Sequence, residues 1–213
     1  MATITDSSET LVSVTEAAVA APPVATLPFW RWSVEQYHEM VRTGIIAEDD
    51  PVELLDGWLV KKMTKSPLHR LVTYLLRETL RRHIPEGWYV DSQEPVTLAA
   101  SEPEPDVVLV RGNPRDYGDR HPGPGDVALM AEVSDSGLPR DRVFKKSLYA
   151  AAGISVYWVV NLVDRRLEVY SDCTRSASDA DYARCDCYAV EDKVPLVVDG
   201  QILAEILLRE ILS

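Results

Sequence analysis

The sequence predicts a mixed α/β or α+β fold in one domain, with a central mixed sheet flanked by helices. Three observations support this prediction. The 213 residues suit one domain with a short extension. Hydrophobic residues make up 46% and charged residues 26%, both ordinary for a globular protein. Helical and strand-like patterns are also interspersed along the chain, and no internal repeat is visible.

The first 26 residues differ from the rest. They are rich in Ala, Ser, Thr and Val and show no clean period. Such a stretch cannot bury enough apolar surface to offset its ordering entropy. We therefore expect a flexible tail over residues 1–26 and a folded domain over 27–213.

Two helices and a hairpin are expected in the next sixty residues. Ser33 is typical of an N-cap for a helix over Val34–Arg42. An Asp-Gly pair between apolar runs predicts a strand-turn-strand over Leu54–Val60. A second helix begins at Pro67, with leucines spaced by three and four, and ends before Pro85.

The remainder alternates between strands and helices. We expect one or two strands within 181–198, a loop over Asn113–Gly125, and helices over Arg140–Ala151 and Ile202–Leu212. Ser155–Leu162 is apolar throughout, as in a fully buried strand, and forms a hairpin with Arg166–Tyr170. The other expected strands are Trp88–Asp91, Pro95–Ala99, Asp106–Val110 and Val127–Val133.

Charge and hydropathy exclude some classes of function. The net charge of −12 argues against bulk attraction to nucleic acid or to an anionic membrane. No segment reaches the 18 or so apolar residues of a membrane span. Residues 61–83 nevertheless hold seven Lys and Arg against one Glu. That stretch is either a local surface for phosphate or an ordinary solvated helix face.

The cysteines indicate a reducing cytoplasm. Cys173, Cys185 and Cys187 are too few and too clustered for a disulfide framework. The first basic residue is Arg31, so no secretory signal is expected. A thiolate zinc site needs four ligands and no fourth cysteine exists, so we expect ordinary thiols.

Two acids at strand ends are the strongest chemical signal. Asp106 follows a proline and opens a strand, and Glu132 stands between apolar residues near the end of another. Two carboxylates from neighbouring strands can hold a hard divalent cation such as Mg²⁺. The alternative is that Glu132 merely faces solvent. Lys145, four residues after Asp141 on a helix, can likewise form an ordinary solvent-facing ion pair with it. Glu53 can be a solvated loop carboxylate.

Together, these residues resemble the Uma-type family of endonucleases, in the PD-(D/E)XK nuclease superfamily, over most of the chain from Leu27. The resemblance implies a restriction-endonuclease-like fold. The matching stretches are VELLDGWLV (52–60), SPLH (66–69), PEPDVVLV (103–110), LMAEVSDSG (129–137), DRVFKKSLYAAAGISVYWVVNL (141–162) and RRLEVY (165–170).

The resemblance also implies roles for single residues. Asp106 and Glu132 match the metal ligands of the superfamily. Ser134 stands where its lysine usually stands, and Lys145 is expected to reach the site from the helix instead. Glu53 matches an upstream acid that holds a second metal or orients the lysine. His69 matches a recurring histidine.

The family pattern is not complete in this chain. Trp58 stands where another acid is frequent, which leaves one-metal and two-metal arrangements open. Arg140 and Arg142 lie near Lys145 in sequence and are expected to contact phosphate together with His69.

The sequence therefore favours an endonuclease that uses Mg²⁺ or Mn²⁺ to hydrolyse DNA phosphodiester bonds, without a small-molecule cofactor. A homodimer would suit double-strand cleavage. One alternative is a non-catalytic module with the nuclease fold that binds DNA or a protein partner. Another is a metal-dependent hydrolase with a different substrate.

Overall fold

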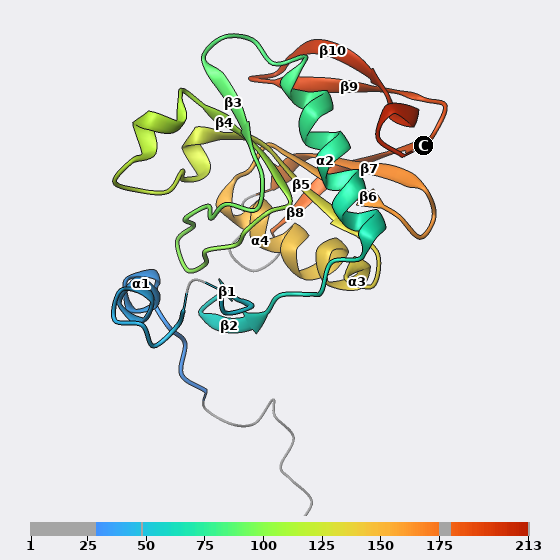
Figure 1. The fold of residues 1–213 in the computed structure, drawn as a ribbon. Helices are drawn as coiled ribbons and strands as arrows, with labels where there is room; N and C mark the ends of the chain where they lie inside the picture. The colour runs from blue at the N-terminus through green and yellow to red at the C-terminus, as the bar shows by residue number, and fades with distance from the viewer. Residues whose placement is uncertain (1–28, 48, 175–179, 213) are drawn as a thin grey trace, which may run out of the picture. The chain divides into compact units, whose positions relative to one another are not determined.

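A six-stranded sheet with the order β3-β4-β5-β6-β7-β8 forms the centre of the fold (Figure 1). The computed structural model describes residues 29–47, 49–174 and 180–212, so the expected tail over 1–26 lies outside the described residues. The strands are β1 Val52–Leu55, β2 Trp58–Lys61, β3 Trp88–Asp91, β4 Val107–Arg111, β5 Val127–Ser134, β6 Val156–Asn161, β7 Arg166–Thr174, β8 Asp181–Ala189, β9 Lys193–Val198 and β10 Gln201–Leu207. The helices are α1 Val34–Arg42, α2 Pro67–Arg81, α3 Leu138–Arg140 and α4 Lys146–Ala152, with a π-helical turn η4 at Asp141–Lys145 and short 3-10 turns η2 Pro114–Tyr117, η3 Pro124–Asp126 and η5 Leu208–Glu210.

The central sheet is mixed, as predicted. In the described part of the sheet, β5 and β6 are the parallel neighbours, and the other adjacent strands run antiparallel. Parallel neighbours need a crossover connection. Here the crossover is the α3–η4–α4 segment, which places a helix over the sheet directly after β5.

Helices cover both faces of this sheet, which confirms the predicted mixed α+β domain. On one face, α2 and the β9–β10 hairpin pack through apolar residues such as Leu76 and Leu196. On the other face, α4 packs through Tyr149 and Ala150. Adjacent residues of β6 point to opposite faces, so each of its strand-central side chains is buried in one of the two layers.

The β1–β2 hairpin is a separate two-stranded sheet below the central one (Figure 1). Its turn is the predicted Asp56-Gly57 pair, and both residues have positive φ, of 49° and 77°. Leu54 forms a β-bridge with Glu102. This bridge holds the hairpin beside the segment that leads into β4.

Two predicted elements are wrong. Residues 95–99 form no strand, because the N–H groups of Val96 and Leu98 donate locally, to Pro103 and Ser101 carbonyls. Ile202–Leu212 is not a helix but the strand β10 followed by a short 3-10 turn. β10 forms a hairpin with β9, and the hairpin buries its apolar side chains against the sheet.

Candidate active site

Asp106 and Glu132 lie on neighbouring antiparallel strands. In the register of β4 and β5, Val107 faces Ala131 and Val108 faces Met130. The next position along this register places Asp106 opposite Glu132. Directly opposed residues point to the same face of a sheet. The two carboxylates predicted from the sequence are therefore brought together.

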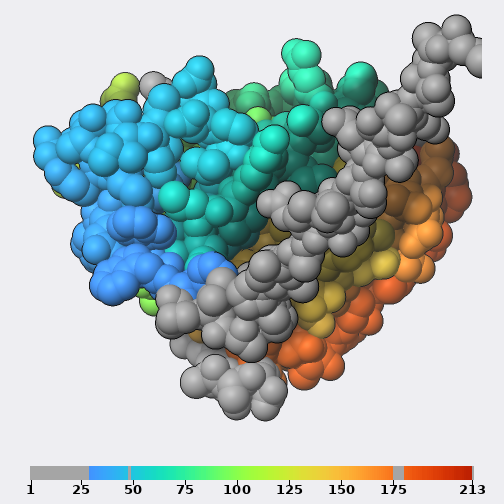
Figure 2. Space-filling view, turned by 90° about the horizontal axis from the view of Figure 1, so that it is seen from below, coloured from blue at the N-terminus to red at the C-terminus, as the bar shows by residue number. Residues whose placement is uncertain are grey.

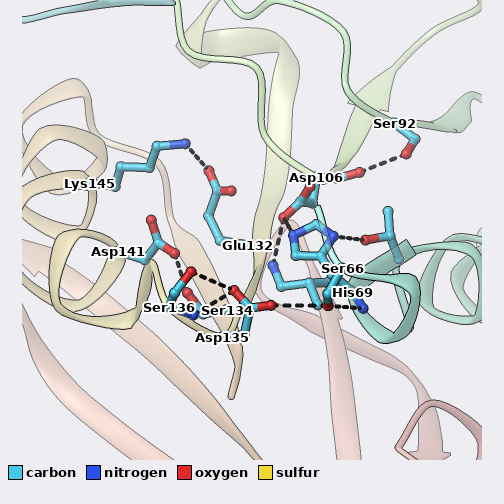
Figure 3. Close-up of polar contacts among 12 residues, drawn as sticks. Ser66, His69, Ser92, Asp106, Glu132, Ser134, Asp135, Ser136, Asp141 and Lys145 are labelled. Carbon is cyan, nitrogen blue, oxygen red and sulfur yellow. Dashed lines mark hydrogen bonds and ion pairs between the residues drawn. The ribbon is translucent and has the colours of Figure 1, made fainter. Parts of the chain in front are cut away.

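Asp106 is held by its surroundings (Figure 3). Its Oδ2 atom accepts a hydrogen bond of 2.9 Å from the N–H of Val133 and lies 3.1 Å from Nε2 of His69. His69 is placed by α2, whose N-cap Ser66 accepts from the His69 N–H. Burial lowers the pKa of His69, but the hydrogen bond and charge of Asp106 raise it overall.

Glu132 does not face solvent. It is 4% exposed, and its Oε1 atom accepts from Nζ of Lys145 at 2.8 Å and from Oη of Tyr149 at 2.7 Å. Burial raises the pKa of Glu132; Lys145 opposes this, and the charges of Asp106 and other nearby acids reinforce it. A buried carboxylate in this setting has a strong affinity for positive charge.

Lys145 reaches the site from the helix rather than from the strand. The π-helical turn that ends at this residue directs its side chain inward, where only 3% of it is exposed. Such turns occur frequently at functional sites. Burial lowers the pKa of Lys145, but the charges of Glu132, Glu53 and Asp141 raise it overall. The ammonium is therefore charged at neutral pH.

Glu53 is a buried member of the same cluster rather than a solvated loop residue. Its Oε2 atom lies 3.5 Å from Nζ of Lys145 and accepts from the N–H of Glu104 at 3.4 Å. Its Oε1 atom lies 3.9 Å from Nη1 of Arg140. The β1–β2 hairpin thus supplies the acid on the far side of the lysine.

Asp141 is a site residue that the sequence reasoning did not single out. It is 4% exposed, its Oδ2 accepts from Oγ of Ser134, and its buried Oδ1 has no hydrogen-bond partner. Burial raises its pKa, opposed by the charge of Lys145. Its position four residues before Lys145 was the available signal, because that spacing places both side chains on one side of a helix.

These groups line a pocket of about 50 Å³. The cations around it are Lys62, Lys65, Arg140 and Lys145, and His69 lies at one side. The acids are Glu53, Glu104, Asp106, Glu132, Asp135 and Asp141.

The donor set fits a hydrated divalent cation. Among the described residues, no group of three or more His, Cys, Asp or Glu side chains is arranged so that it could hold a metal ion by itself. Mg²⁺ needs no such group, because it keeps several waters and binds through one or two carboxylates. The opposed Asp106 and Glu132 supply two. Oδ1 of Asp141 and Nε of Arg140 form an ion pair at 3.7 Å, and both are buried atoms without a hydrogen bond that ordered water in the pocket would satisfy.

Arg142 lies outside this cluster. It is directed to Glu168 on β7, to which its Nε donates at 2.9 Å, and it does not line the pocket. The cysteines are also apart from the site: Cys185 and Cys187 are exposed free thiols on β8 and Cys173 is a half-buried free thiol on β7.

A mixed sheet with opposed carboxylates on two strands, and a lysine paired with one of them, defines the restriction-endonuclease-like class of proteins. The chain belongs to the Uma2 family, described as "Putative restriction endonuclease", whose model matches residues 34–197. This membership confirms the resemblance found in the sequence and supports a nuclease function.

The fold has a counterpart among solved structures. A crystal structure from Anabaena variabilis ATCC 29413, described as "a putative nuclease belonging to DUF820", aligns with a TM-score of 0.62 at 11% identity. The alignment covers 84% of this chain and 97% of that one. No curated protein matched the chain. Among the described residues, no helix is both long and apolar enough to cross a membrane.

Proposed function

We propose that this protein is a metal-dependent endonuclease that hydrolyses phosphodiester bonds of DNA. The observation that carries the proposal is the convergence of Asp106, Glu132 and Lys145 in one pocket, on three elements that the fold brings together. Family membership supports the reaction class.

Asp106 and Glu132 would hold the ion, Mg²⁺ or Mn²⁺. When bound, such an ion supplies positive charge against the phosphate and lowers the pKa of a coordinated water. His69 and the Val133 N–H fix the orientation of Asp106.

Lys145 would donate a hydrogen bond to the reacting water or to the phosphate. Its ammonium carries three N–H donors, and Glu132 and Glu53 take up only part of this capacity. A donor fixed in advance in a buried site offsets charge that develops in the transition state. Glu53 acts as a positioning residue for this lysine, and Arg140, at the rim, is placed to contact a phosphate oxygen.

The test is cleavage of circular DNA, both single-stranded and supercoiled, with Mg²⁺ or Mn²⁺. Wild type should convert the circles to nicked or linear products. Asp106→Ala and Lys145→Ala should not. The matched control is Lys146→Ala, because the neighbouring Lys146 pairs with Asp181, outside the pocket.

Equal cleavage by all four proteins would point to a contaminating nuclease and contradict the proposal. No cleavage by any, together with DNA binding, would favour the alternative of a non-catalytic DNA-binding module. The proposal places the enzyme in the cytoplasm, which the cysteine content favours.

A further inference from the structure

A strip of unpaired cations runs from the end of β2 onto α2. No acid occurs in the sequence between Gly57 and Arg77. Lys61, Lys65 and Arg70 are exposed, and none of the three has an ion pair with a described residue. Most other exposed cations of the described residues pair with a neighbouring acid, as Arg111 does with Asp199 at 2.8 Å, and Arg115 and Arg165 are the exceptions. We call Lys61, Lys65, Arg70 and Tyr74 the basic strip.

The basic strip begins at the proposed active site. Lys65 lines the pocket itself, and the carbonyl of Lys61 accepts from Arg140 at its rim. Arg70 directly follows His69, which contacts Asp106. The first turn of α2 holds no acid, so the positive end of the helix dipole adds to this potential. Figure 2 shows this side of the molecule, with the teal surface of β2 and α2 beside the blue surface of α1.

Tyr74 extends the strip along α2. It lies four residues after Arg70, so the two side chains are neighbours on the helix surface. The tyrosine is 57% exposed, so its ring is accessible from solvent. Cations followed by an exposed aromatic ring are the surface on which a nucleic-acid strand binds by phosphate contacts and base stacking.

A second groove beside the pocket is lined by more acids than Lys and Arg side chains. This groove of about 1090 Å³ meets the pocket at Lys62 and Glu104 and is also lined by the acids Asp50, Glu94, Glu102 and Asp119. Cations that line this groove already form ion pairs with acids: Lys62 pairs with Glu104 at 2.6 Å, and Arg120 pairs with Asp126 at 2.7 Å. A duplex carries a second phosphate chain across its groove, and that chain would be pushed toward these acids.

The depth of the site adds a steric argument. The side chains of Asp106, Glu132 and Lys145 are only 8%, 6% and 3% exposed, at the base of a recess of about 50 Å³. A phosphodiester must enter this recess to react. A single strand can turn its neighbouring nucleotides away from the rim, whereas stacking and pairing hold a duplex backbone on a smooth cylinder.

We infer that the substrate is single-stranded DNA, bound with its phosphates on Lys61, Lys65 and Arg70 and with a base stacked on Tyr74. This inference rests on the proposed function, because it names the substrate class of the same site.

The test measures binding without turnover. The full chain carrying Asp106→Asn is titrated, in EDTA, into a fluorescent thymidine 30-mer and into a duplex of equal length, and anisotropy is followed at several salt concentrations. Single strands should bind at least about tenfold more tightly than the duplex. Lys65→Ala with Arg70→Ala should weaken single-strand binding about tenfold and reduce the slope of log affinity against log salt by about 1.4.

Two further variants separate charge from stacking. Tyr74→Leu should weaken single-strand binding about tenfold, and Tyr74→Phe should leave it unchanged, because the ring is retained. Arg184→Ala with Lys193→Ala is the matched control, because it removes the same charge from β8 and β9 and should have little effect.

Tighter binding of the duplex, no binding of either DNA, or equal losses in the strip and control variants would each overturn the inference. Failure of the proposed function would look different: single strands would bind through the strip, and wild type would cleave nothing.

Discussion

Two buried glutamates on one face of the sheet make an informative comparison. Glu132 on β5 pairs in register with Val159 on β6, which pairs in turn with Glu168 on β7. The two acids are therefore separated by two strand spacings, about 10 Å. The same π-helical turn above them supplies a cation to each, Lys145 to Glu132 and Arg142 to Glu168.

The two acids differ in how fully they are satisfied. Glu168 accepts from Arg142, Arg166, Asn161 and Tyr170. Burial raises its pKa, but the hydrogen bonds from Arg142, Tyr170 and Asn161 lower it to about 2. Glu132 has two donors and a surrounding group of other acids, and its pKa is raised. A carboxylate that accepts from several donors stabilises the fold, whereas a carboxylate with few donors beside a pocket is available for chemistry.

The largest expected contrast is in activity. Glu132→Gln should reduce DNA cleavage on the order of 10³-fold, because the site loses a charged ligand. Its amide can still accept from Lys145 and Tyr149, so the protein should remain folded. Glu168→Gln should cleave near the wild-type rate. Similar losses of cleavage activity in both variants, measured on circular DNA, would contradict the distinction between the two glutamates.

Metal binding gives the second contrast. Mn²⁺ at about 100 times its dissociation constant should stabilise wild type by about 2.7 kcal/mol. For a domain of this size that raises the melting temperature by about 5–10 °C. Asp106→Ala should lose this rise and Glu168→Gln should keep it, as measured by differential scanning fluorimetry. An undiminished rise in Asp106→Ala would mean that the ion binds elsewhere.

The third contrast depends on pH. The pKa of Glu168 is lowered from its usual 4.5, so the ionised form adds stability above pH 4.5 that is lost as pH falls toward 2. Glu168→Gln should therefore cost about 2 kcal/mol of unfolding free energy at pH 7, since Arg142 is about a third exposed, and much less at pH 3. Urea denaturation at both pH values measures this. A cost independent of pH would show that packing, not charge, is responsible.

The smallest contrast compares two hydroxyl groups. Tyr149 donates to Glu132 and Tyr170 donates to Glu168. Replacing either with Phe should cost about 1 to 2 kcal/mol of stability. Only Tyr149→Phe should also lower cleavage, by about tenfold, because Glu132 is left with Lys145 alone. An equal kinetic effect of Tyr170→Phe would extend the active site to the second network.

Local signals predicted most of the fold. The Asp56-Gly57 turn, the caps of α1 and α2, and the buried β6 strand are set by residues adjacent in sequence. The C-terminal error came from giving helical spacing priority over a turn signal. Asp199-Gly200 is a second Asp-Gly pair with positive φ at both residues, and it joins β9 to β10.

The site was less predictable than the fold. The structure brings together Asp106, Glu132, Glu53 and Lys145, the three acids and one lysine that the sequence grouped. Arg142 is one turn of helix from Lys145, yet it points to a different strand. That direction depends on a π-helical turn and on Glu168, which lies far along the chain, so no local pattern could reveal it.

The crossover between β5 and β6 also has a consequence for biosynthesis. A chain emerges from the ribosome N-terminus first, and parallel pairing across a long connection forms late in folding. The strand that anchors the crossover, β6, follows Lys145 in sequence, and Tyr149, which braces Glu132, lies inside the crossover. A nascent chain therefore carries its acids before it can fix its lysine. On the proposed function, the active site is complete only after β6 has been synthesised and paired with β5.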